Sequence, residues 1–150
     1  MSQLSEVREA IATTIRNAGW SRGFNVYAYE PTTPQHPSVV ISLANDDPID
    51  WNGTYGAQRM TEVRLRARIL IPVGSSLETA LRILDDVLSQ GSGEGSSFAD
   101  TFYADPTLGG LGAIRALTVT NVGVLERAED GVQATLVGAD VPLTVNIYRS

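Results

Sequence analysis

Residues 58–73 are the stretch that most constrains what this chain can fold into. Between residues 62 and 71 every second position is apolar, and charged residues such as Glu62 occupy most of the others. Because successive side chains of a β-strand point to opposite faces, this alternation is typical of a strand with one buried and one solvated face. The buried face needs a cover, which we expect helices to provide. The apolar positions are Val63, Leu65, Ala67, Ile69 and Ile71.

Two segments have the three- and four-residue spacing of amphipathic helices. We expect the first to end at Gly19. We expect the second to begin at Ser75, where Glu78 three residues later completes a capping box. The apolar stripes are Leu4, Val7, Ile11, Ile15 and Ala18 in the first helix, and Leu77, Leu81, Leu84 and Leu88, widened by Ala80 and Val87, in the second.

Shorter patterns predict the remaining elements. The polar segments 45–57 and 90–97 are expected to be surface loops, with a tight turn at the Asn52-Gly53 pair. A helical turn is expected within 98–103 and a hairpin tip at 129–131. Further strands are expected at 24–30, 39–44, 114–125, 132–137 and 141–148. The sequence therefore predicts an α+β fold: a mainly antiparallel sheet with two or three helices packed on one face, as a single domain over residues 1–150.

The composition argues against several classes of protein. A net charge of −6 disfavours a free-standing nucleic-acid binder, because affinity for phosphate comes from clustered Lys and Arg. Without cysteine there is neither a disulfide nor a thiolate metal site. No apolar run reaches the about 18 residues of a membrane span, and the first residues lack a signal peptide's pattern, so we expect a cytosolic protein. All eleven basic residues are arginine, which indicates either pairing with carboxylates or GC-rich codon usage.

The sequence offers no recognisable catalytic chemistry. The single histidine, His36, lies between two prolines, and no Gly-x-Ser-x-Gly motif of a serine nucleophile accompanies it. The glycines of 91–95 lack the lysine and the preceding strand of a phosphate-binding loop. Asp46, Asp47 and Asp50 lack the spacing of a calcium loop. We therefore expect no catalytic, cofactor or metal site and no enzyme. The opposing hypothesis is an enzyme that works with carboxylates alone, which would need a buried pair of them in a pocket.

Two groups of residues are candidates for an interface. Arg64, Arg66 and Arg68 alternate along residues 58–73 and therefore share one face. They either pair with acidic residues of neighbouring strands or meet an acidic surface on another subunit, where the arginine fork binds carboxylates. The segment 45–57 contains large aromatic residues in a polar loop, which either packs on its own domain or docks on a partner. Its candidate residues are Asp46, Asp47, Asp50, Trp51 and Tyr55.

The order of these elements resembles that of the tail terminator (tail completion) proteins of long-tailed siphophages. The residues behind the resemblance are 104–110, with the sequence Ala-Asp-Pro-Thr-Leu-Gly-Gly, and 138–145, with the sequence Gly-Ala-Asp-Val-Pro-Leu-Thr-Val. A first helix over 7–20 and the apolar run 39–41 add to it, so the similarity extends over nearly the whole chain. The lengthened, aspartate-rich segment 45–57 departs from the family pattern.

The resemblance implies a structural virion protein without enzymatic activity. Such a protein forms a homohexameric ring on the head-proximal end of the tail tube, stops tube polymerisation and provides the surface that joins the head. Its implied partners are further copies of itself, the major tail tube protein and a head-tail connector or stopper protein. DNA passes through the ring without sequence-specific binding, and assembly takes place in the host cytoplasm. The alternative within this class is a connector or stopper ring of the neck. We expect segments 45–57 and 90–97 to contact neighbouring rings and to become ordered on assembly.

Overall fold

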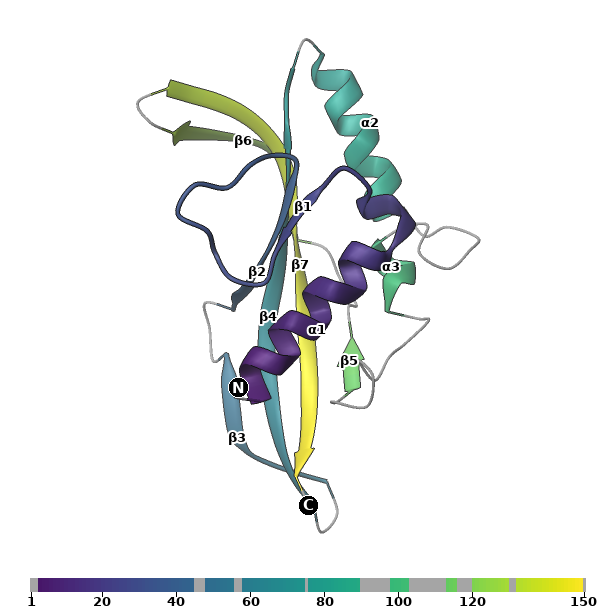
Figure 1. The fold of residues 1–150 in the computed structure, drawn as a ribbon, viewed down its shortest axis with the longest axis vertical. Helices are drawn as coiled ribbons and strands as arrows, with labels where there is room; N and C mark the ends of the chain where they lie inside the picture. Colours follow the sequence, from purple (N-terminus) through teal and green to yellow (C-terminus); the bar gives the residue numbers. More distant parts are fainter. Residues whose placement is uncertain are drawn as a thin grey trace.

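The computed structural model describes residues 3–44, 48–55, 58–74, 76–89, 98–102, 113–115, 120–129 and 132–149. These residues form a seven-stranded, mostly antiparallel sheet with helices on one face, which confirms the predicted α+β class (Figure 1). Because β1 (Asn25–Tyr27) pairs in parallel with β2 (Ser38–Leu43), the sheet is mixed.

Two long strands, β4 (Gln58–Pro72) and β7 (Val132–Arg149), form the centre of the sheet. They pair antiparallel without a break from Arg59↔Arg149 to Pro72↔Leu136. In this register apolar residues lie opposite apolar residues, as at Leu65↔Leu143. The predicted central strand is therefore confirmed. The two predicted strands 132–137 and 141–148 are one continuous strand.

Each outer edge of this central pair is formed by two short strands placed end to end. Along β4, β2 pairs with residues 65–70 and β3 (Ile49–Tyr55) pairs with residues 58–63. Along β7, β6 (Thr120–Glu129) pairs with residues 132–140 and β5 (Ala113–Arg115) pairs with residues 144–146. The predicted strand over 114–125 is confirmed for residues 114–115 and 120–125, and residues 116–119 lie outside the described part of the chain.

The helices cover one face of the sheet (Figure 1). They are α1 (Gln3–Asn17), α2 (Leu77–Leu88) and the single turn α3 (Phe98–Thr101), and a short 3₁₀ turn, η1 (Gly19–Ser21), follows α1. Trp20 donates from Nε1 to Thr101 Oγ1 at 2.7 Å and its ring packs against Phe98, which links the end of α1 to α3. The core side chains from the helices are Val7, Ile11, Ala12, Ile15, Ala80, Leu84, Val87 and Phe98.

The helix predictions need two corrections at α2. Its N-cap is Ser76, whose Oγ accepts from the Thr79 backbone N–H at 3.3 Å, and not Ser75, which lies outside the described residues. Its buried stripe runs through Ala80, Leu84 and Val87, while Leu77 is 44% exposed. The helix contains more apolar residues than one face can hold, and packing against the sheet selects among the overlapping stripes.

The prediction of a long surface loop over 45–57 was wrong for residues 49–55, which form β3. This strand pairs with β4 through a register shift between Asp50 and Gly53. The Asn52-Gly53 pair thus lies within an irregular strand instead of at a tight turn, in keeping with glycine's frequent place at bulges. Segment 90–97 lies outside the described residues, so its prediction is not tested.

Two hairpins extend from opposite ends of the sheet (Figure 1). At one end β7 continues past its last pair with β4, and its residues 132–135 pair with β6. One bond still links this extension to the chain after β4: the Val73 N–H donates to the Thr135 carbonyl. The closing pair Glu129↔Val132 is consistent with the predicted hairpin tip. At the other end the β3–β4 hairpin extends beside the C-terminus of β7.

Two residues of β7, Pro142 and Gly138, are unusual in a central strand. Pro142 lies opposite Arg66 of β4, between the last described pair with β6, at Asp140, and the first described pair with β5, at Thr144. Gly138 lies where β4 approaches so closely that a Cβ would overlap the Ile69 carbonyl oxygen and lie 3.0 Å from Leu70 Cδ2.

We predict that Gly138→Ala lowers the free energy of unfolding by about 1 to 3 kcal/mol, because backbone atoms cannot make room for the added methyl group. Urea denaturation followed by circular dichroism measures this. The matched control is Gly74→Ala, where an added Cβ meets no atom within 4 Å and the expected change is below about 1 kcal/mol. Equal losses for the two variants would contradict the proposed close approach.

Candidate interaction surface

The three arginines of β4 lie together on the sheet face opposite the helices. Odd-numbered residues of β4 such as Leu65 are buried against the helices, so the even-numbered Arg64, Arg66 and Arg68 project from the other side. This face includes Ser42 of β2 and Asp140 of β7, which lie opposite Arg66 and Arg68 in the pairing register. We call it the arginine face.

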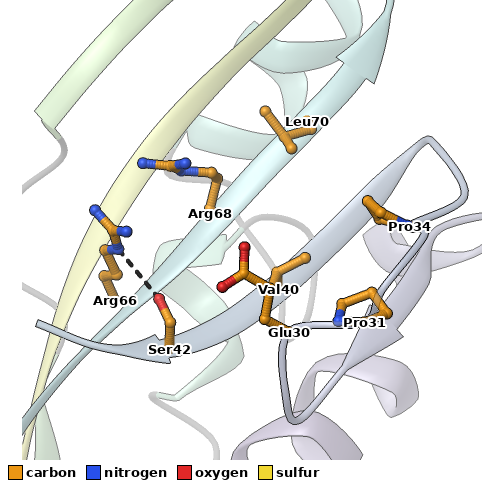
Figure 2. Close-up of a pocket in the computed structure, with 8 residues that line it drawn as sticks. All are labelled: Glu30, Pro31, Pro34, Val40, Ser42, Arg66, Arg68 and Leu70. Carbon is orange, nitrogen blue, oxygen red and sulfur yellow. Dashed lines mark hydrogen bonds between the residues drawn. The ribbon is translucent and has the colours of Figure 1, made fainter. Parts of the chain in front are cut away.

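Each of the three arginines has a polar partner within the chain. Arg68 Nε donates to Asp140 Oδ1 at 3.0 Å, and the Asp140 side chain is only 8% exposed. Arg66 Nε donates to Ser42 Oγ at 3.1 Å (Figure 2). Arg64 Nε lies 3.3 Å from Glu62 Oε1 on the same strand, and both of these side chains are partly exposed. Pairing within the sheet therefore occurs, and contact with another subunit stays a prediction.

The guanidinium group of Arg66 is the least satisfied of the three. Its Nε bonds to a neutral hydroxyl, and among the described residues its two terminal nitrogens have no partner. A guanidinium group has five N–H donors, four of which belong to these terminal nitrogens. Arg66 thus keeps both of the parallel donors that bind a carboxylate in bidentate fashion.

A shallow pocket opens beside Arg66 and Arg68. It has an empty volume of about 350 Å³, part of it open to solvent, and lies between the sheet and the connection from β1 to β2 (Figure 2). Leu70 and Val40 form an apolar side, and the Glu30 carboxylate points toward the arginines without an ion pair among the described residues. The lining residues are Glu30, Pro31, Pro34, Val40, Ser42, Arg66, Arg68 and Leu70.

Side-chain hydrogen bonds hold the connection that walls this pocket. The Gln35 N–H donates to Tyr27 Oη at 3.1 Å, and Asn25 Nδ2 donates to the Gln35 carbonyl at 3.1 Å. The His36–Pro37 peptide bond is cis, and His36 Nδ1 lies 3.0 Å from Ser38 Oγ. His36 therefore lies in the loop that walls the pocket, with the Ser38 hydroxyl as a neighbour.

Of the acidic and aromatic candidates, three lie on β3 and two lie outside the described residues. Asp46 and Asp47 lie outside the described residues. Asp50, Trp51 and Tyr55 lie on β3, where Asp50 is exposed and Trp51 is 73% exposed. Asp50 lies opposite Glu62 in the register, so the structure brings this acidic candidate next to the Glu62–Arg64 pair. The side chain of Tyr55 is outside the described part of the chain.

Three residues of this surface were not candidates from the sequence. Asp140, Ser42 and Glu30 reach the arginines from three other segments, and Asp140 is 72 residues from its partner. Local patterns cannot reveal such pairs without the strand register. The available signal was the motif 138–145, whose aspartate is a charged residue within an apolar strand pattern.

Within the described residues, no cluster of three or more His, Cys, Asp or Glu has metal-binding geometry, and none of the helices is long and apolar enough to cross a membrane. Comparison with protein-family models and with curated proteins finds no match for this chain.

We predict that Asp140→Asn lowers the free energy of unfolding by about 1 to 3 kcal/mol, because it weakens a charge-assisted bond to Arg68 at a buried position. Thermal or urea unfolding measures the change. Glu78→Gln is the control, since Glu78 and Arg82 form an exposed pair, 73% and 76% exposed, whose loss should cost less than about 1 kcal/mol. A larger loss at Glu78 than at Asp140 would contradict this assignment.

Proposed function

We propose that this protein is a tail terminator: a ring-forming structural protein that occupies the head-proximal end of a siphophage tail tube, stops tube growth and joins the tail to the head. The resemblance in element order and in residues 104–110 and 138–145 is the basis of the proposal. The observation that supports it best is the layered shape of the domain, which has helices on one side of the sheet and the arginine face on the other.

This layering suits a ring. In a closed ring each subunit presents two different surfaces, one to the preceding copy and one to the following copy. A sheet with helices on one face presents two chemically distinct sides on opposite sides of one domain. Arginine and aromatic side chains are enriched in protein interfaces, and the described surface includes exposed Trp51 and the arginine face.

The two ends of the sheet suit contacts above and below such a ring. A two-stranded hairpin is only marginally stable alone. The extension of β6 and β7 beyond Pro72↔Leu136 therefore favours a further contact with a partner, and at the opposite end the β3–β4 hairpin presents the exposed Trp51. We propose the major tail tube protein at one end and a connector or stopper protein at the other, with DNA passing through the ring without sequence recognition.

The test combines the purified protein with its cognate tail tubes. We expect one end of each tube to be capped in negative-stain images and further tube growth from added tube protein to stop. Binding to portal-bearing heads without binding to tubes would favour the connector or stopper ring. Binding to neither would overturn both assignments.

We predict that Trp51→Ala lowers the affinity for tube ends at least about tenfold, because exposed tryptophan is a frequent hot spot of protein interfaces. The free energy of unfolding should change by less than about 0.5 kcal/mol, since the side chain is 73% exposed. Sedimentation of protein with tubes measures the affinity. Trp51→Phe keeps an aromatic contact and should retain most of the binding. Full binding by Trp51→Ala would exclude this hairpin from the tube contact.

A further inference from the structure

From the charges on opposite faces of the sheet we infer that the arginine face, centred on Arg66, binds the exposed carboxylates Asp85 and Asp86 of α2 in a second copy of this chain. This inference deepens the proposed function, because it assigns the contact between successive subunits of the ring.

The arginine side of the contact has unused hydrogen-bond donors. Arg66 keeps two terminal nitrogens without partners among the described residues, beside a pocket with an apolar side formed by Leu70 and Val40. Arg68 is bound to Asp140 and Arg64 to Glu62, so both are already neutralised in part.

The carboxylates that would accept these hydrogen bonds lie on the opposite face of the domain. Asp85 and Asp86 are exposed on α2, and neither has an ion pair among the described residues. Arg82 is the basic residue of α2, and its Nη2 donates to Glu78 Oε1 at 2.9 Å. Ile83 is 40% exposed on the same helix and supplies an apolar side chain beside the carboxylates. The outer face of α2 therefore combines unpaired negative charge with apolar surface, as the pocket combines unpaired positive charge with apolar surface.

A second copy is the partner that this arrangement fits. The two surfaces are different and lie on opposite sides of one sheet, so a contact between two copies leaves the arginine face free on one copy and the α2 face free on the other. Such a head-to-tail contact continues from copy to copy and closes into a ring where the rotation permits. A contact that used the same patch twice would instead stop at a dimer.

The test exploits the absence of cysteine from the natural sequence. A full-length variant with Glu30→Cys and Ile83→Cys has one thiol at the pocket rim and one on α2, with the sheet between them. A short bifunctional maleimide should then link different copies and give a ladder of dimers, trimers and larger products on denaturing gels. Variants with only one of the two cysteines should stop at dimers.

Charge reversal in this double-cysteine background identifies the residues. Arg66→Glu should lower the yield of trimers and larger products at least about tenfold, as should Asp85→Arg together with Asp86→Arg. Combining all three changes in one chain should restore the ladder. Arg22→Glu, at another exposed arginine, is the control and should leave the yield unchanged.

Arg66→Gln covers the case in which Arg66→Glu fails to fold, because the glutamine amide can still donate to Ser42 while the charge is lost. We expect Arg66→Gln to lower the yield of trimers and larger products several-fold. The Asp85 and Asp86 substitutions lie on α2 and leave the pocket unchanged. A ladder that is absent, stops at dimers or is insensitive to these charges would overturn the inference. Tube capping without a ladder would overturn the inference alone, and a ladder without capping would overturn only the proposed function.

Discussion

The antiparallel pairing of β4 with β7 is the interaction on which the rest of the structure depends. Its register puts Val63 opposite Val145 and Leu65 opposite Leu143, so both strands present their apolar residues to the helices. A slip by one residue would turn those side chains to the solvent side and place arginine beneath α1 and α2. Each buried Leu or Ile contributes about 1.5 to 3 kcal/mol, so the helices strongly favour one register.

The same register determines the chemistry of the opposite face. Because Arg68 lies opposite Asp140 and Arg66 lies opposite Ser42, the alternation that builds the core also positions the polar contacts of the arginines. Core and surface are therefore not independent in this protein. A substitution that shifts β7 along β4 would disturb both the hydrophobic layer and the Arg68–Asp140 bond.

Periodic segments could be predicted from the sequence, and segments decided by distant contacts could not. The alternation over 58–73 located β4, and the helical spacing located α1 and α2, because each has a strong period of its own. The strand β3 escaped prediction because its Asn, Gly and Asp residues favour turns locally, while pairing with β4 holds it extended. The predicted stripe of α2 was wrong at Leu77, which is exposed, because several apolar stripes overlap on that helix.

For the candidate surface, the shared face of Arg64, Arg66 and Arg68 could be predicted from the alternation of β4, but their partners could not. Asp140 and Glu30 come from segments whose position depends on the sheet register and on the β1–β2 connection. Arg64 and Arg68 pair with carboxylates, whereas Arg66 bonds to a neutral hydroxyl. This difference singles out Arg66, and it also depends on distant neighbours.

The end-to-end arrangement of short strands has a consequence for misassembly. β4 and β7 are long and apolar on one face, and a long exposed strand edge is a template for aggregation. Here the outer edge of β4 is covered by two strands, β2 and β3, which meet at Arg64: its carbonyl accepts from the Ala44 N–H and its N–H donates to the Pro48 carbonyl. An incoming foreign strand on this side thus meets two shorter strands in place of one long edge. The break limits the length of regular backbone that this side of the hydrophobic sheet offers as a template.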